Sequence, residues 1–306
     1  MKKAIFPLMV MSMACGMAHA QSSVTVYGIM DLGLVKSSGA ALQETYNKQD
    51  RLGFLGTEDL GDGLKAKFQL ESRFSADTGA LASALLFHGE SWVGLASNSL
   101  GEVRFGRQYT PIFRQGGLRV DPFAAEGVAT TANSYLVGAP RDNNAINYIT
   151  PSMAGFVVTS QYALSEVTTG VGKQNGYGAS LTYDMGPLSA NLSYDKAVGT
   201  DAFYGQVGAG YIFGPAKVTL GYVRGETKVA GTGTTKGVQA GLNYTVGLGN
   251  IKATFSTLEN ATGDLRKQFG GGYEYYLSKR TNLYAYVNRE QKLSVTSTQL
   301  GVTHRF

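Results

Sequence analysis

Aromatic residues recur eleven positions apart across short glycine-containing turns in the second half of the chain. Residues equally far from a tight turn lie opposite one another on antiparallel strands, so this spacing predicts hairpins with facing aromatic residues. The flanking residues alternate between apolar and polar, which a soluble sandwich would also show. Tyrosines beside every short turn are better explained by the interfacial girdle of a transmembrane β-barrel. The three pairs are Tyr183/Tyr194, Tyr211/Tyr222 and Tyr244/Phe255.

The first twenty residues have the three parts of an export signal. Lys2 and Lys3 form a positive n-region, an apolar stretch follows, and Ala18-His19-Ala20 is a small-x-small cleavage site. A membrane anchor is the weaker alternative, because the apolar run is well short of the ~20 residues of a spanning helix. Acylation of Cys15 is disfavoured, since the residues before it fit poorly. We expect residues 1–20 to be a signal peptide and residues 21–306 to form the barrel.

The composition fits an exported barrel better than a soluble enzyme or a nucleic-acid-binding protein. Glycine contributes 41 of 306 residues, and charged residues are 16% of the chain, below the usual ~25% of globular domains. Without Lys2 and Lys3 the remaining chain has 25 basic and 22 acidic residues, a surplus too small to indicate nucleic acid as a partner. The only cysteine lies in the leader, so the expected mature chain has no disulfide and no thiol nucleophile.

About sixteen segments have the length and alternation of transmembrane strands, and an even number is typical of bacterial single-chain barrels. Alternation is strongest in Leu64–Phe74 and poor in the fourth, fifth and fifteenth segments. For the fifteenth segment, Thr281–Glu290, the sequence does not decide which side faces lipid. The expected strands are Ser23–Val35, Arg51–Glu58, Leu64–Phe74, Glu90–Ala96, Glu102–Gln108, Asn143–Thr150, Phe156–Leu164, Gly176–Met185, Leu188–Ala197, Phe203–Phe213, Ala216–Glu226, Gly237–Val246, Ile251–Leu258, Lys267–Leu277, Thr281–Glu290 and Thr296–Phe306.

Short and long connections alternate along the chain. Gly186-Pro187 and Gly214-Pro215 are short, whereas Ser165–Asn175 and Glu259–Arg266 are longer and polar. Outer-membrane barrels have short periplasmic turns and longer outside loops. We therefore expect both termini and the tyrosine pairs to lie at the periplasmic end, and the last strand, which ends at Phe306, to close against the first.

One connection, Tyr109–Pro140, contains no convincing strand, and such segments longer than about 12–15 residues are uncommon unless functional. The sequences on either side of it are the most specific in the chain. Together with three further motifs they resemble the general diffusion porins of Gram-negative outer membranes, particularly those of beta-proteobacteria. The motifs are Gly106–Pro111, Arg141–Tyr148, Val26–Gly28, Gly53–Gly61 and His304–Phe306.

The resemblance implies an all-β architecture: a homotrimer of sixteen-stranded antiparallel barrels in the lipid of the outer membrane. It also implies that the third outside loop, residues 109–140, folds into the pore and narrows it. A barrel of this size leaves an aqueous channel. We therefore expect passive diffusion of ions and small hydrophilic solutes, without a cofactor.

In this family a cluster of arginines on the barrel wall faces acidic or backbone groups of the loop. Arginines keep their charge at neutral pH, and basic residues at a constriction favour anions. Relatives carry an arginine in the strand containing His88–Trp92, where this chain has none, so we expect only a modest anion preference. Alternatively, the arginines form a solvated ladder or fix the loop by hydrogen bonds. The candidate constriction residues are Arg51, Arg73, Arg107 and Arg141, with Glu71, Asp121 and Glu126 as opposing acids.

A barrel enzyme is the first alternative to a channel, but the sequence gives it little support. Acyl-transfer chemistry needs a base within reach of a nucleophile, and the expected mature chain has only His88 and His304, the latter on a predicted lipid-facing position. No cluster of histidine and cysteine suggests a metal site. Gly270–Gly272 lies in an expected strand and not before a helix, so it does not indicate a phosphate loop.

Two further alternatives concern the loops and the outer surface. A substrate-specific channel would need a track of ligands along the pore, to which Phe123 and Tyr135 could contribute. A surface adhesion or antigen module is disfavoured by the short surface loops. Trp92, in the poorly alternating fourth strand, would suit a face covered by another subunit.

Overall fold

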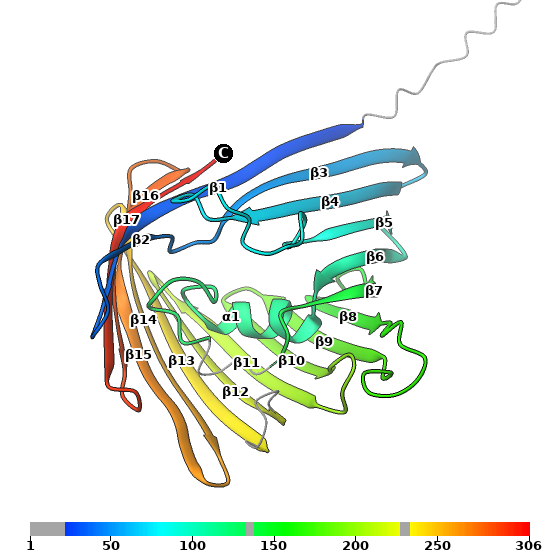
Figure 1. Ribbon diagram of the computed structural model, residues 1–306. Helices are drawn as coiled ribbons and strands as arrows, with labels where there is room; N and C mark the ends of the chain where they lie inside the picture. The colour runs from blue at the N-terminus through cyan, green and yellow to red at the C-terminus, as the bar shows by residue number, and fades with distance from the viewer. Residues whose placement is uncertain (1–21, 133–137, 227–232) are drawn as a thin grey trace, which may run out of the picture.

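The chain forms an antiparallel β-barrel in the computed structural model (Figure 1). The structure describes residues 22–132, 138–226 and 233–306, so the expected signal peptide lies outside the described residues. The sheet closes because β1 (Ser23–Ser37) pairs with β17 (Val295–Arg305) on one side and with β3 (Asp50–Gly61) on the other. This closure gives both edges of the sheet a partner.

Sixteen long strands make up the described wall, and each corresponds to one of the expected segments. The additional β2 (Gln43–Thr45) is a short strand in the first long connection and pairs with β1. The sixteen-stranded barrel is thus confirmed. The remaining strands are β4 (Leu64–Phe74), β5 (Ser91–Ser97), β6 (Gly101–Tyr109), β7 (Arg141–Ile149), β8 (Phe156–Ala163), β9 (Gly176–Met185), β10 (Leu188–Lys196), β11 (Phe203–Phe213), β12 (Ala216–Glu226), β13 (Thr234–Val246), β14 (Gly249–Asn260), β15 (Gly263–Tyr276) and β16 (Thr281–Glu290).

The alternation along the strands separates an exposed apolar face from a buried polar one. On neighbouring strands Leu192 and Val207 are paired and exposed, whereas Ser193 and Gln206, one position further, are paired and buried. β16 follows the same rule: its Tyr284 and Tyr286 face the lumen, and Leu283 is exposed. The face that the sequence left open is thereby settled. Apolar side chains outside and polar side chains inside suit a wall that has lipid around it and a polar lumen.

The expected facing of the aromatic pairs is wrong. Tyr183 lies opposite Ala190, and Tyr194 lies opposite Ala179, because the two-residue turn at Gly186-Pro187 sets the register. The other two pairs are displaced in the same way. The first member of each pair lies beside a short turn, whereas Tyr194 lies near the opposite end of β10, where its ring stacks on Tyr177 at 6.2 Å. Only the first members therefore mark the short-turn end.

Trp92 also differs from expectation, because it lies inside the barrel. Its side chain is 5% exposed, and the guanidinium carbon of Arg104 is 4.1 Å from its ring centre. Trp92 pairs with Gln69, whose amide donates to the Tyr27 hydroxyl within the lumen. Trp92 therefore offers no contact to a neighbouring subunit.

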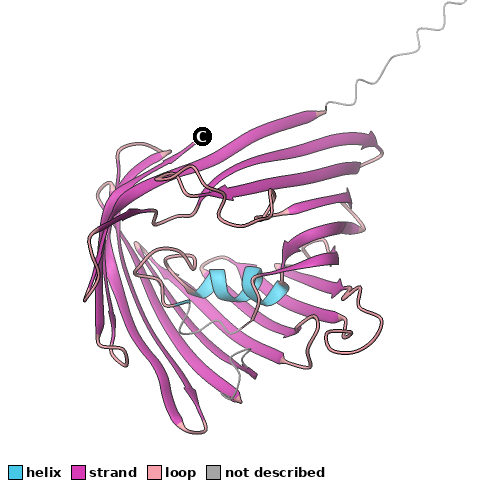
Figure 2. Cartoon of the chain, in the orientation of Figure 1, coloured by secondary structure: helices cyan, strands magenta, loops and turns pink. Residues whose placement is uncertain are grey.

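Two short helical segments, η1 (Ile112–Gly117) and α1 (Leu118–Val120), lie between β6 and β7. Figure 2 shows them in front of the inner face of the wall, and η1 contacts β9, β10 and β11. Among the described residues no helix is long and apolar enough to cross a membrane.

Candidate pore constriction

The third long connection, residues 110–140 and here called L3, is hydrogen-bonded to inward-facing side chains of the wall. Each bond joins L3 to a strand that lies far away in the sequence. Together the bonds fix the path of L3 along the inside of the barrel. They include Thr219 Oγ1 to the Val120 carbonyl (2.5 Å), Gln239 Nε2 to Thr131 Oγ1 (2.9 Å), Gln268 Nε2 to the Thr130 carbonyl (3.3 Å) and the Val128 N–H to Gln299 Oε1 (3.2 Å).

Glycines of the wall allow L3 to approach closely. A Cβ atom at Gly270 would lie 1.9 Å from the carbonyl oxygen of Ala129, and one at Gly241 would lie 2.6 Å from Pro122. Real Cβ contacts this short do not occur, so the wall needs glycine at both positions. Gly241 and Gly270 therefore allow the docking of L3.

Asp121 organises L3 itself and does not oppose the arginines. Its buried carboxylate accepts hydrogen bonds from the N–H groups of Phe123 and Ala125, both at 3.0 Å, and from the Thr130 hydroxyl. Burial raises the pKa of Asp121, and these donors oppose the increase. Phe123 is also buried, packing edge-on against Tyr286 with ring centres 5.2 Å apart. Phe123 therefore does not line the pore as a solute ligand, and Tyr135 lies outside the described residues.

Arg51 and Arg73 lie on adjacent strands and are directly paired in register. Arg73 binds Glu71 through Nε at 2.9 Å and Nη2 at 2.8 Å. Glu126 of L3 accepts a hydrogen bond from Arg51 and lies 3.6 Å from Nη1 of Arg73. The structure thus brings together four of the predicted residues, with one acid from the wall and one from L3.

Arg141 joins this group through Tyr109. The Tyr109 hydroxyl accepts hydrogen bonds from Nη2 of Arg73, at 2.7 Å, and from Nη2 of Arg141. Arg107 takes a different position: it donates to the His88 carbonyl at 3.0 Å and to Asn143 Oδ1 at 2.7 Å. Of the four predicted arginines, three therefore meet at one place and Arg107 lies to one side.

A cavity of about 550 Å³ opens beside this group, and the arginines dominate its charge. Its charged lining residues are Arg51, Arg73, Arg114, Arg141 and Glu126. Uncharged side chains complete the lining, among them the polar Gln49 and the apolar Phe113 and Leu118. Four positive charges therefore surround this cavity, together with one carboxylate.

Arg114 was missed by the sequence reasoning. It lies in η1, above the ring of Tyr109 at 5.3 Å and 3.8 Å from the carboxylate of Glu90. Burial raises the pKa of Glu90, and the charge of Arg114 opposes that increase. Burial and nearby arginines lower the pKa of His88. In the sequence, Arg114 is only one arginine three residues after Pro111 in a segment without strands. Its position there does not predict the direction of its side chain.

The residues considered above for catalysis, phosphate binding or metal binding lie in the wall of the barrel or form no site. His304 is exposed on the outer face and hydrogen-bonds Thr281 at 2.9 Å, as its predicted lipid-facing position requires. Gly270–Gly272 lies within β15. In the described part of the chain, no three histidine, cysteine, aspartate or glutamate side chains form a potential metal site.

A closed wall of sixteen long strands with an arginine-lined lumen is the architecture of a porin, and comparison with known proteins decides the family. The model of the Gram-negative porin family matches residues 8–292. The chain belongs to the Gram-negative porin family. Outer membrane porin protein 32 of Delftia acidovorans is 36% identical to this porin, over 93% of this chain and 88% of the relative.

Solved structures agree with this assignment. The anion-selective porin from Comamonas acidovorans matches with a TM-score of 0.80 and 31% identity, over 94% of this chain and all of that one. OmpT of Vibrio cholerae, in a trimer form, shares the fold with a TM-score of 0.73 and 17% identity, over 93% and 99% of the two chains. This porin is an outer-membrane protein that forms a channel for passive diffusion.

Proposed function

We propose that this porin passes ions and small hydrophilic solutes with a modest preference for anions, set where L3 approaches the wall arginines. The observation that carries the proposal is the charge around the cavity: four arginines and one glutamate line it. Arg51, Arg73 and Arg141 are the wall residues of this filter, and Arg114 is the contribution of L3. Arg107, whose contacts are elsewhere, has a smaller effect on permeation.

The preference is modest because carboxylates lie close to the arginines. Glu71 and Glu126 bind Arg73, and Glu90 lies near Arg114. Fixed positive charge concentrates anions in a narrow water-filled space, but mobile salt screens it over ~10 Å at 0.1 M. The Comamonas acidovorans porin, described as anion-selective, supports the same sign of selectivity.

Reversal potentials across a planar bilayer with a salt gradient test this proposal. We expect the native channel to favour chloride over potassium, and Arg141→Glu to shift the reversal potential towards cations. Lys217→Glu is the matched control, because Lys217 lines a different cavity. Cation selectivity of the native channel would contradict the proposal. Saturable block by one class of solute would instead favour a substrate-specific channel.

We further propose a homotrimer without enzymatic activity, made from a precursor that loses residues 1–20. The porin family supports the trimer and the lack of activity, and the leader pattern of residues 1–20 supports the processing. Native mass spectrometry of the detergent-solubilised protein should give three copies, each beginning at Gln21. A monomeric mass would contradict the assembly, a retained leader would contradict the processing, and hydrolysis of lipid or peptide by the pure protein would contradict the lack of activity.

A further inference from the structure

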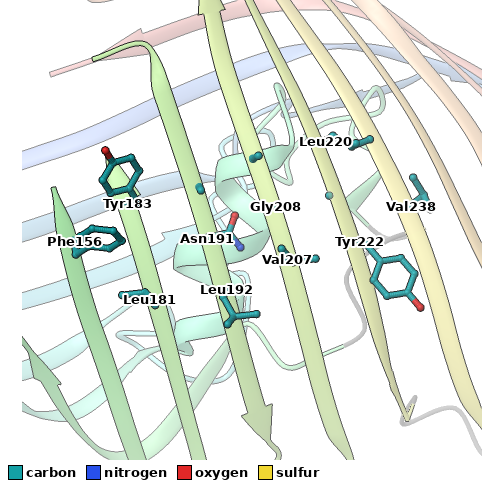
Figure 3. Close-up of a pocket in the computed structure, with 13 residues that line it drawn as sticks. Phe156, Leu181, Tyr183, Asn191, Leu192, Val207, Gly208, Leu220, Tyr222 and Val238 are labelled. Carbon is teal, nitrogen blue, oxygen red and sulfur yellow. The ribbon is translucent and has the colours of Figure 1, made fainter. Parts of the chain in front are cut away.

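The helical part of L3 rests on strands that carry none of the clustered arginines. η1 contacts β9 to β11, and α1 contacts β11 to β13. Figure 3 shows Gly208 of β11 in front of these helices, and a Cβ atom at Gly208 would lie 2.7 Å from Cγ2 of Val120. Arg51 and Arg73 lie on β3 and β4, and L3 binds them through Glu126. L3 alone therefore does not enclose these two arginines.

A second segment reaches the lumen beside the arginines. It is the end of the first long connection, residues 38–49, here called L1, which contains β2. Tyr46, Asn47 and Gln49 of L1 line the same cavity of about 550 Å³ as the arginines. Asn47 is only 3% exposed. The end of L1 therefore belongs to the constriction.

Two buried carboxylates fix the end of L1 to the barrel wall. Asp31 of β1 accepts hydrogen bonds from the Asn47 N–H at 2.7 Å and from the Tyr284 hydroxyl of β16 at 2.8 Å. Asp50, the residue after L1, accepts from the N–H groups of Asp31 at 2.6 Å and Ala76 at 2.9 Å. Both aspartates are fully buried. Because hydrogen bonds to ionised carboxylates are the stronger ones, these contacts hold L1 on a defined path.

L1 and L3 touch next to Glu126. Gly127 of L3 has a φ angle of 76°, and a Cβ atom there would lie 1.9 Å from Oδ1 of Asn47. A side chain at this position would displace one of the two loops. L1 and L3 therefore form one packed unit beside the arginines.

Gln49 connects L1 to both wall arginines. Its backbone carbonyl accepts from Nε of Arg51, and its side-chain Oε1 accepts from Nη1 of Arg73, each at 3.0 Å. The two arginines lie directly opposite each other, an arrangement in which like charges repel. Gln49 satisfies donors of both without adding a negative charge, whereas Glu71 and Glu126 offset the charge that they bind. Gln49 therefore holds the two cations without weakening their field.

We propose that L1 forms the second side of the anion filter, and that Gln49 is a positioning residue that keeps Arg51 and Arg73 directed at the permeating ion. This inference rests on the proposed anion preference and extends its origin from L3 to L1. Without the Gln49 side chain, Nη1 of Arg73 turns to Glu126, which already lies 3.6 Å away. The guanidinium group then pairs more closely with a carboxylate, and less of its charge acts on the ions.

Reversal potentials of two variants test the role of Gln49. Gln49→Met keeps a side chain of similar length and removes the acceptor, whereas Gln49→Glu keeps the acceptor and adds a negative charge. We expect the chloride-to-potassium permeability ratio to fall by about twofold in Gln49→Met and further in Gln49→Glu. In an Arg73→Ala background, Gln49→Met should cause no additional change, because the residue through which it acts is absent. An equal change in that background would overturn the proposal.

The native channel separates failure of this inference from failure of the proposed function. A native channel that favours cations would contradict the anion preference and, with it, the role of Gln49. A native channel that favours anions, together with an unchanged ratio in Gln49→Met, would overturn the role of Gln49 alone.

Thiol labelling tests the position of L1 independently of selectivity. The only cysteine of the chain lies in the leader, so Tyr46→Cys adds a single thiol to the expected mature chain. Leu42→Cys is the matched control on L1, because Leu42 is 60% exposed and lies outside the cavity lining. Normal conductance before labelling shows that both variants are folded.

We expect a charged thiosulfonate reagent to lower the single-channel conductance of Tyr46→Cys and to leave that of Leu42→Cys unchanged, with mass spectrometry confirming the reaction of both. If the Tyr46→Cys channel does not react, or conducts normally after labelling, L1 does not face the permeation path and the proposal is wrong.

Discussion

The guanidinium carbon of Arg141 lies 4.0 Å from the ring centre of Tyr109, and the same guanidinium donates a hydrogen bond to the Tyr109 hydroxyl. Arg73 donates to this oxygen from another strand at 2.7 Å. Tyr109 is the last residue of β6, immediately before L3. One phenol therefore holds two like-charged groups in position at the base of the loop.

Removal of the Tyr109 hydroxyl should loosen this arrangement without changing the sign of selectivity. In Tyr109→Phe both arginines lose an acceptor while the ring contact stays, so we expect the free energy of unfolding to fall by about 1–3 kcal/mol. Thermal unfolding in detergent measures the loss, and single-channel records should show increased open-channel noise. Tyr148→Phe is the control, because the exposed Tyr148 hydroxyl donates only to the Leu100 carbonyl. If both variants unfold alike, the bridging role is wrong.

Glu126→Gln should strengthen anion preference. The change removes the one carboxylate among the charged residues of the cavity lining while keeping a side chain of similar size next to Arg51 and Arg73. We expect the chloride-to-potassium permeability ratio to rise by on the order of twofold in dilute salt, and less in concentrated salt, where charges are screened. Reversal potentials at two ionic strengths provide the measurement. A shift towards cations would show that Glu126 does not face the permeation path.

Acidification should increase anion preference through Glu90. Because burial raises the pKa of Glu90, this carboxylate loses its charge as pH falls through the raised value, while ordinary exposed carboxylates remain ionised. Arg114 then loses its partner. Glu90 binds a proton more tightly in the folded state than in the unfolded state. The folded state therefore also gains stability as the pH falls from the raised pKa of Glu90 towards its ordinary pKa.

The measurement is the reversal potential as a function of pH, compared with Glu90→Gln. We expect the native channel to show a step towards anions that the variant lacks. His88, whose pKa is lowered, would gain charge only at more acidic pH and is present in both proteins. An identical pH dependence in the two proteins would exclude Glu90 as the titrating group.

Two adjacent glycines of β15 provide a matched test of how L3 is seated. Gly270→Ala places a methyl group 1.9 Å from the Ala129 carbonyl oxygen, whereas the nearest atom to a Cβ at Gly271 is 3.6 Å away. We expect Gly270→Ala to push L3 towards the pore axis, lowering single-channel conductance and costing about 1–3 kcal/mol of stability. Gly271→Ala should conduct normally. Equal conductance in both variants would mean that L3 does not control the aperture.

The sequence predicted the strands well because a period of two encodes both a strand and its orientation. It also predicted the bounds of β16, but left open which face of that strand meets lipid, because tyrosines alternate with apolar residues there. Tyr284 donates to Asp31 of β1 and Tyr286 to Glu274 of β15, so both hydroxyls are satisfied by carboxylates of other strands. Their inward direction is a property of the assembled barrel and not of the local pattern.

The candidate site was predictable only where the alternation is regular. Arg51 and Arg73 follow the strand period and meet as expected, whereas a register shift between Gly106 and Gln108 separates Arg107 from the group. Within L3, Ala124 and Ala125 both adopt positive φ angles, of 55° and 60°. Such conformations are rare for alanine, so no sequence pattern predicted the turn that brings Glu126 to the arginines.

The closure of β1 on β17 has a consequence for how a channel of this kind can change. In a closed sheet the circumference depends on the number of strands and their tilt, which follows from the hydrogen-bond register. The width of the barrel can therefore change only in discrete steps of strand number or register. L3 is subject to no such restriction, because its backbone crosses the lumen side and is attached to the wall by individual hydrogen bonds. Permeability can therefore be tuned continuously through one inserted segment while the surface presented to the bilayer stays the same.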